Sequence, residues 1–237
     1  MRKEIIIKIN NIKTSKYCLI IGGKGIHKAR SPKIWNYFFK QSNIDAQMIP
    51  LMVDRSEISN LLKFLSKDPK FLGGSVAKPH KEIVFKNVKN LDLAKKIKSV
   101  NCIFKINTTL FGDNTDGYGF IKSLSKYKKL KTINNSIVLG YGGVGKSITH
   151  YLDSQLNKKS KIYLFRRKLT KTNLSKKTKS RNWGNLSSEI KNVDLVVNCT
   201  SLGDINNVNK SPIFFKDSNI FNKKAFFFDA IYNPKVT

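Results

Sequence analysis

The sequence predicts an α/β fold, with enough length for one large or two small domains. Apolar segments of strand length alternate with segments of helical periodicity along much of the 237 residues, an order that is typical of parallel sheets covered by helices. A glycine-rich turn at residues 140–145 also joins an apolar strand directly to a helix. Hydrophobic residues make up 40% of the chain, which is sufficient for a buried core.

Strands and helices are expected to alternate in the first half of the chain. Runs of apolar residues indicate the strands, and apolar residues three or four positions apart indicate the helices. Pro79 is well placed to open a helix, because the first helical turn leaves its N–H groups unpaired and proline has none. The expected elements are strands at residues 17–21, 47–51 and 100–106, a helix from Ser31 that carries Ile34, Phe38 and Phe39, a helix through Ile58, Leu61 and Leu65, a helix from Pro79 through Val84 and Val88, and a helix capped by Asp116.

The net charge of the chain bears on whether it binds nucleic acid. A net charge of +30 would normally indicate a polyanionic partner. The lysines are spread along the whole chain, however, and form neither a single tract nor a pattern with stacking aromatics. We therefore expect no specific nucleic-acid partner.

No apolar run approaches the roughly 18 residues that span a bilayer, and residues 1–8 lack the apolar centre of a signal peptide.

Cysteine usage indicates the compartment. Cys18, Cys102 and Cys199 are odd in number and far apart. This spacing suggests neither a disulfide framework nor a zinc site, and it is typical of a reducing environment. We therefore expect a soluble, cytoplasmic protein that holds no metal.

The glycine-rich turn is the strongest single motif. Its glycines let the backbone approach a ligand closely, and the free N–H groups of the following helix favour a bound phosphate. The run at residues 140–147 matches the phosphate loop of nucleoside triphosphatases, in which Lys146 would reach the terminal phosphates and Ser147 would bind magnesium. The same run also matches a dinucleotide-binding loop, in which a pyrophosphate lies on the same helix end.

The segment after the loop favours the dinucleotide interpretation. An apolar strand at residues 161–165 ends in Arg166, Arg167 and Lys168, where an NAD-binding domain usually has an acidic residue for the ribose hydroxyls. Cations at this position suit a 2′-phosphate, because guanidinium and ammonium groups bind phosphate well and a carboxylate would repel it. The sequence therefore favours NADP as the cofactor.

Seven motifs in one order carry a resemblance to a known family. Each motif is short, and no single one would suffice. Together, over roughly residues 17–237, they resemble shikimate dehydrogenase. The motifs are Ser-Pro at residues 31–32, Gly-Ser-Val-Ala-Lys-Pro-His-Lys at 74–81, Ser-Val-Asn at 99–101, Gly-Asp-Asn-Thr-Asp-Gly at 112–117, the glycine loop, Asn-Cys-Thr-Ser-Leu-Gly at 198–203 and Asp-Ala-Ile-Tyr-Asn-Pro at 229–234.

The resemblance implies two domains and a reaction. Residues 17–120 would form a substrate-binding catalytic domain and residues 121–237 a Rossmann-like NADP-binding domain, with a cleft between them and residues 1–16 as an N-terminal extension. The implied reaction is the reversible reduction of 3-dehydroshikimate to shikimate by NADPH, with quinate as a possible second substrate. A monomer or a homodimer is expected.

The resemblance also implies a role for individual residues. Lys81 resembles the catalytic lysine of the family, which exchanges a proton with the reacting oxygen, and Asp116 resembles its carboxylate partner. The residues implied in substrate binding are Ser31, Ser75, Asn101 and Tyr232. Those implied in cofactor binding are Gly140, Gly142, Gly143, Val144, Gly145, Arg166, Arg167, Lys168 and Thr200.

Several features depart from the family pattern. Ala29 and Ala77 stand where the family usually has serine and threonine, and Asp204 replaces an apolar residue expected near the nicotinamide. The printed sequence ends at Thr237, where members of the family continue with a helical segment that packs on the first domain. Two alternatives to a working enzyme therefore stay open: an inactive nucleotide-binding remnant of the family and, less favoured, a nucleoside triphosphatase.

Overall fold

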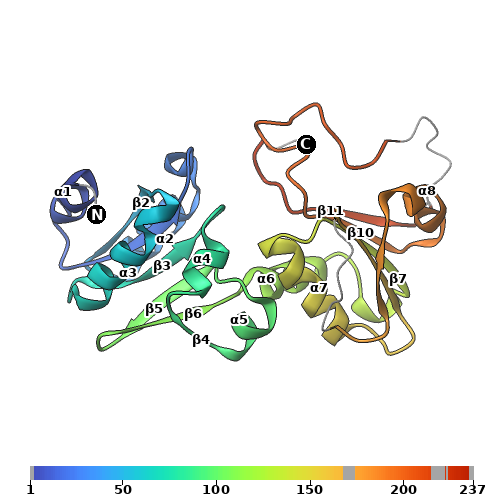
Figure 1. Ribbon diagram of the computed structural model, residues 1–237, viewed down its shortest axis with the longest axis horizontal. Coiled ribbons are helices and arrows are strands. Elements are labelled where there is room, and N and C mark those ends of the chain that lie inside the picture. The colour runs from blue at the N-terminus through green and yellow to red at the C-terminus, as the bar shows by residue number, and fades with distance from the viewer. Residues whose placement is uncertain (1–2, 168–173, 215–221, 223, 235–237) are drawn as a thin grey trace. The chain divides into compact units, whose positions relative to one another are not determined.

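The computed structural model describes residues 3–167, 174–214, 222 and 224–234. The chain divides into two compact units, Met1–Thr115 and Asp116–Thr237. Figure 1 shows both units as sheets covered by helices, which confirms the α/β fold class. The boundary expected after residue 120 falls inside helix α6 (Asp116–Leu124), and contacts between α6 and α7 (Gly143–Gln155) join all of α6 to the second unit.

The first unit is built on a six-stranded mixed sheet of order β2-β1-β3-β5-β6-β4. Strand β1 is parallel to β2 and β3, whereas β5 is antiparallel to β3 and β6. The strands are β1 (Lys16–Gly22), β2 (Ala46–Met52), β3 (Phe71–Val76), β4 (Lys89–Asn90), β5 (Cys102–Ile106) and β6 (Thr109–Asp113), and the helices are α1 (Lys3–Asn10), α2 (Ser31–Gln41), α3 (Ile58–Lys67), α4 (Lys81–Phe85) and α5 (Asp92–Ile97).

Alternate residues of β1 face two different cores, as the period of a strand requires. Tyr17, Leu19 and Ile21 pack in the main core with the apolar face of α3, and Ile20 packs in a smaller cluster with Phe39 of α2. Helix α1 lies within the stretch expected to be an N-terminal extension. Its Ile5 and Ile9 are buried in the main core, so α1 is part of the folded unit.

Two helices of this unit differ from their expected form. Helix α2 buries Phe39 but leaves Ile34 and Phe38 at 66% and 49% exposure, because the apolar residues of this helix extend beyond the face that meets the sheet. Helix α4 begins at Lys81, after Pro79, and ends before Val88. Its backbone leaves the helix to form the short edge strand β4, which pairs with β6.

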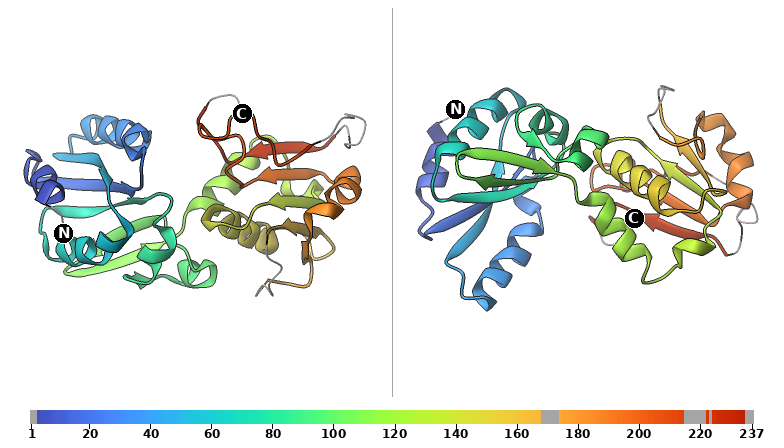
Figure 2. Two further views of the ribbon diagram at one scale, coloured as in Figure 1. Left: turned by 45° about the horizontal axis from the view of Figure 1, so that its top comes forward. Right: turned by 90° about the horizontal axis from the view of Figure 1, so that it is seen from below.

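The second unit contains a five-stranded parallel sheet of order β11-β10-β7-β8-β9 (Figure 2). Helices α6 and α7 pack in a cluster on one face, and α8 packs in a cluster on the other. The order reverses between β7 and β10, and ligands of open α/β sheets bind at such a reversal, beyond the carboxyl ends of the strands. The remaining elements are β7 (Asn135–Leu139), β8 (Lys161–Phe165), β9 (Thr178–Arg181), β10 (Leu195–Asn198), β11 (Phe226–Asp229) and α8 (Leu186–Glu189).

No helix in the described ranges combines the length and the apolar character needed to cross a membrane.

Candidate active site

The glycine loop follows β7 at the reversal of the strand order. Gly140 has a φ of +93°, which favours glycine, and its N–H donates to the carbonyl of Phe165 at 2.8 Å. A Cβ on Gly145 would lie 2.2 Å from the Gly140 oxygen, so helix and loop touch there. A Cβ on Gly142 would meet nothing within 4 Å. The loop is therefore closed on its inner side and open at Gly142, beside the first turn of α7, where N–H groups favour an anion.

The cations predicted for the 2′-phosphate differ in their surroundings. Arg166 is 8% exposed, and its guanidinium carbon lies 5.0 Å from the centroid of the Tyr141 ring. Among the described residues, its buried Nε and Nη2 atoms have no hydrogen-bond partner. Arg167 is exposed, and Lys168 lies outside the described residues. A buried guanidinium with two nitrogens that have no hydrogen-bond partner among the described residues, next to an open helix N-terminus, fits the phosphates of a dinucleotide.

The loop after β10 is held by its own side chains. Thr200 donates its hydroxyl to Oδ1 of Asn198 at 2.7 Å and accepts from the N–H of Leu202 at 3.1 Å. Asn198 donates its amide to Asp229 at the end of β11. The sequence analysis assigned a role in cofactor binding to Thr200 and none to Asn198. The signal for Asn198 was its place as the first residue of the same motif, directly after a run of apolar residues.

Asp116 is the first residue of α6 in the second unit. Burial raises the pKa of the Cys199 thiol, and the charges of Asp229 and Asp116 raise it further. The Asp116 carboxylate thus interacts electrostatically with the residue that follows β10. Cys199 also lies against the loop, since a Cβ on Gly145 would be 3.3 Å from its Cβ.

The contacts of Ser147 do not support the nucleoside triphosphatase interpretation. That interpretation requires the Ser147 hydroxyl to bind magnesium next to a phosphate. The hydroxyl instead is buried and accepts the N–H of Gly117 at 2.8 Å. Among the residues that the structure describes, no group of three or more His, Cys, Asp or Glu side chains could hold a metal ion.

In the first unit, main-chain pairing brings Ser75, Lys81 and Asn101 together. Ser75 of β3 pairs with Cys102, the residue after Asn101. Asn101 accepts the N–H of Val76 at its carbonyl at 2.7 Å, and Lys81 accepts the N–H of Val100 in the same way at 3.0 Å. Three of the residues predicted for substrate binding and catalysis therefore lie on neighbouring backbone. His80, next to Lys81, is a core residue, because it is buried and its Nε2 lies 2.8 Å from the Val53 carbonyl.

Asn101 also binds the end of the first unit. Its Oδ1 accepts the N–H of Thr115 at 2.9 Å, and its Nδ2 donates to the Thr115 hydroxyl at 3.2 Å. Asn114 beside it is buried and donates to the Ser99 carbonyl. The segment that precedes Asp116 is thus fixed by hydrogen bonds to Ser99 and Asn101, just before β5.

The remaining predicted residues lie in less enclosed positions. Ser31 is half-buried as the first residue of α2, and Tyr232 is 61% exposed. Ala29 and Ala77, where hydroxyls are usual in the family, pack against the small apolar cluster of Ile20. Asp204 accepts from the N–H of Asn206 at 3.0 Å and from the Asn207 amide at 3.2 Å, so its carboxylate stabilises a turn.

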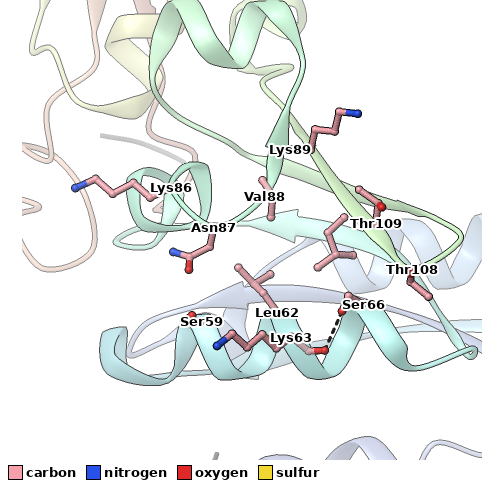
Figure 3. Close-up of a pocket in the computed structure, with 11 residues that line it drawn as sticks. Ser59, Leu62, Lys63, Ser66, Lys86, Asn87, Val88, Lys89, Thr108 and Thr109 are labelled. Atoms are coloured by element: carbon pink, nitrogen blue, oxygen red, sulfur yellow. Dashed lines mark hydrogen bonds between the residues drawn. The ribbon is translucent and has the colours of Figure 1, made fainter.

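A separate groove lies on the first unit, away from these residues. It has a volume of about 420 Å³ and lies between α3, the turn after α4 and the hairpin of β5 and β6. The residues that line it include the apolar side chains of Leu62 and Val88 and the lysines Lys63, Lys86 and Lys89 (Figure 3). None of the residues predicted for substrate or cofactor lines this groove.

Comparisons of the sequence with known proteins identify one family. Residues 21–103 match the model of the shikimate dehydrogenase substrate binding domain. A shikimate dehydrogenase (NADP(+)) of Pelagibacter ubique is 33% identical over 232 residues, which cover 94% of this chain and 82% of that protein. One of Clostridium beijerinckii is 34% identical over 222 residues, which cover 92% of this chain and 78% of that protein.

Solved structures extend the similarity to the fold. The structure of a chorismate mutase/shikimate 5-dehydrogenase fusion protein from Clostridium acetobutylicum is 27% identical, with a TM-score of 0.79 over 93% of this chain and 79% of that one. Shikimate dehydrogenase 1 from Peptoclostridium difficile is 26% identical, with a TM-score of 0.76 over 92% of this chain and 78% of that one. The chain therefore belongs to the shikimate dehydrogenase family, a family of oxidoreductases.

Proposed function

We propose that this chain catalyses the reversible reduction of 3-dehydroshikimate to shikimate with NADPH. The observation that carries the proposal is the similarity over more than nine-tenths of the chain to relatives named shikimate dehydrogenase (NADP(+)). The residues that the family's motifs assign to substrate and cofactor are present in both units, and the contacts described above are compatible with their roles.

The second unit supplies the binding site for the cofactor in this proposal. Gly140, Gly142, Gly143, Val144 and Gly145 would receive the pyrophosphate at the N-terminus of α7. Arg166 would bind the 2′-phosphate through its Nε and Nη2 atoms, which have no partner within the described ranges, with exposed Arg167 beside it. Thr200 would lie near the nicotinamide. When bound, the cofactor supplies the hydride, and the protein supplies binding, orientation and the proton.

Lys81 is the proposed proton donor and acceptor. In the reduction, its ammonium would give a proton to the oxygen that becomes the new hydroxyl, and in the oxidation its amine would take that proton back. The side chain stands at the start of α4, and its main chain is fixed to Val100 by a hydrogen bond. A fixed backbone limits the positions that the ammonium can reach, and orientation of this kind is a large part of catalysis.

Asp116 is the proposed carboxylate partner of Lys81. A carboxylate favours the charged form of a nearby ammonium and accepts hydrogen bonds from substrate hydroxyls. Ser31, Ser75, Asn101 and Tyr232 would bind the substrate by hydrogen bonds. Because Asn101 already engages Thr115 through its side chain, its amide is held in a fixed orientation for this task.

The test is a turnover assay on the purified protein that follows formation of the reduced nicotinamide. Shikimate with NADP is the reaction that we expect to proceed, and NAD in place of NADP or quinate in place of shikimate serves as the comparison. Turnover with shikimate and NADP supports the proposal. NADP binding without turnover of either substrate would contradict it and would identify the chain as an inactive member of its family.

A further inference from the structure

Tyr141 and Arg166 form a pair that the main chain holds in place. Tyr141 is the second residue of the glycine loop, and Arg166 follows the last residue of β8. The hydrogen bond from Gly140 to Phe165, at 2.8 Å, joins the two residues that immediately precede them. The guanidinium carbon lies 5.0 Å from the ring centroid, within the range of a cation–π interaction. The ring is therefore positioned by the same backbone that forms the phosphate loop.

A second arginine, Arg181, also lies against a tyrosine ring, and the comparison shows how Arg166 differs in its ionic partners. The guanidinium carbon of Arg181 lies 5.3 Å from the ring centroid of Tyr163. Arg181 also donates its Nε to Glu189 at 2.7 Å, so a carboxylate neutralises it. Arg166 is 8% exposed, and within the described part of the chain its Nε and Nη2 atoms are buried without any partner. A buried cation without a counter-ion is costly, which indicates that an anionic group completes this site.

We propose that Tyr141 determines the specificity for the cofactor, by holding the Arg166 guanidinium where it binds a 2′-phosphate. This inference rests on the proposed function and goes beyond it, because neither the motif of the loop nor that of the cations assigns a role to this ring. The loop pattern requires glycines and leaves the second position free, and the chain has a tyrosine there.

The ring acts on the guanidinium in two ways. It covers one face of the group and excludes water from it, which strengthens the electrostatic attraction between the cation and a phosphate. It also restricts the rotamers of a long side chain, so that less entropy is lost when the phosphate binds. Both effects strengthen the binding of a dinucleotide that carries the 2′-phosphate and leave the binding of one without it unaffected. They therefore increase the discrimination between NADP and NAD.

Binding of two small probes isolates this effect from catalysis. Adenosine 2′,5′-bisphosphate carries the 2′-phosphate and 5′-AMP lacks it, and the ratio of their dissociation constants, from titration calorimetry, measures the discrimination. In Tyr141→Leu we expect the ratio to fall about 5-fold to 30-fold, the loss of a cation–π interaction of about 1 to 2 kcal/mol. Tyr141→Phe keeps the ring and should keep the ratio within about twofold. Tyr163→Leu, which removes the ring under Arg181, is the matched control and should also keep the ratio.

The outcomes separate this inference from the proposed function. If the wild-type protein does not distinguish the two probes, the NADP assignment fails and the role of Tyr141 fails with it. If the wild type discriminates and Arg166→Gln abolishes the discrimination, but Tyr141→Leu retains it, the proposed cofactor stands and the inference about Tyr141 is overturned. The inference about Tyr141 is also overturned if Arg166→Gln leaves the ratio of the two dissociation constants unchanged. Circular dichroism and thermal unfolding verify that each variant is folded.

Discussion

The hydroxyl of Ser147 accepts the backbone N–H of Gly117 at 2.8 Å, and this hydrogen bond joins the cofactor helix α7 to the first turn of α6. The N–H of Gly117 belongs to the first turn of its helix, where such groups have no partner within the helix. Ser147 thus caps α6 from a neighbouring helix. Asp116 precedes Gly117 directly, so the proposed catalytic carboxylate and the phosphate loop belong to the same compact unit and are joined by this contact between α6 and α7.

Close packing at Gly117 gives the first prediction. A Cβ at this position would lie 2.3 Å from Cδ2 of Tyr151 and 2.6 Å from the Ser147 carbonyl oxygen. We expect Gly117→Ala to lower the free energy of unfolding by about 1 to 3 kcal/mol, because one of these groups must move. Gly119→Ala is the matched control in the same helix, since its Cβ would meet nothing within 4 Å. It should stabilise the protein by about 0.5 to 1 kcal/mol.

Urea unfolding of the two variants measures both changes. Equal stability of Gly117→Ala and Gly119→Ala would contradict the close approach of α6 and α7.

The open position in the glycine loop gives the second prediction. A Cβ at Gly142 has free space, whereas a Cβ at Gly145 would lie 2.2 Å from the Gly140 oxygen. We expect Gly142→Ala to leave the melting temperature unchanged and to raise the dissociation constant of NADP at least about tenfold, because the methyl group occupies the space of the pyrophosphate. Gly145→Ala should lower the melting temperature. Unimpaired NADP binding by Gly142→Ala would show that the phosphates lie elsewhere.

Cys18 gives a prediction for alkaline pH. Burial in the sheet raises the pKa of this thiol from an ordinary value of 9.0 to about 11, partly offset by a backbone hydrogen bond from Gly73. Between these two values the folded protein holds a proton that the unfolded chain has lost. The contribution of Cys18 to stability is therefore complete below pH 9 and is lost as the pH rises towards 11.

Replacing the thiol isolates this contribution. The difference in unfolding free energy between the wild type and Cys18→Ala should be constant around neutral pH and should shrink or reverse across the alkaline window. A difference that stays constant across that window would exclude a raised pKa for Cys18. Thermal or urea unfolding at a series of pH values makes the comparison.

The fold was largely predictable where the period of the apolar residues was unambiguous. The strands near residues 17–21 and 47–51 and the strand, loop and helix around Gly140 were all expected, and each has a continuous apolar face. Strand β6 was not among the expected elements, because Gly112 lies within it and glycine is uncommon inside strands. Here the glycine packs closely against Val88 and Val100. Helix α1 was missed because its short apolar run precedes the motifs and only tertiary packing buries Ile5 and Ile9.

For the candidate site, the sequence indicated the residue types but not their partners. Arg166 was one of three equivalent cations in the sequence, and only the structure distinguishes it as buried over Tyr141. Ser147 was considered for magnesium, because its role towards Gly117 depends on the packing of two helices that no local pattern specifies. The roles of Lys81 and Asp116 stay predictions, since they follow from the motifs of the family and not from contacts within either unit.

The role of Lys81 is the central claim, and the turnover number of Lys81→Ala tests it most directly. Lys86→Ala is the matched control, because Lys86 lies at the other end of the same short helix and is exposed. We expect Lys81→Ala to lower kcat with shikimate and NADP about 10²-fold to 10⁴-fold, the usual contribution of general acid–base catalysis, while the dissociation constant of NADP and the kcat of Lys86→Ala stay at the wild-type level. A kcat for Lys81→Ala that equals that of Lys86→Ala would contradict the account.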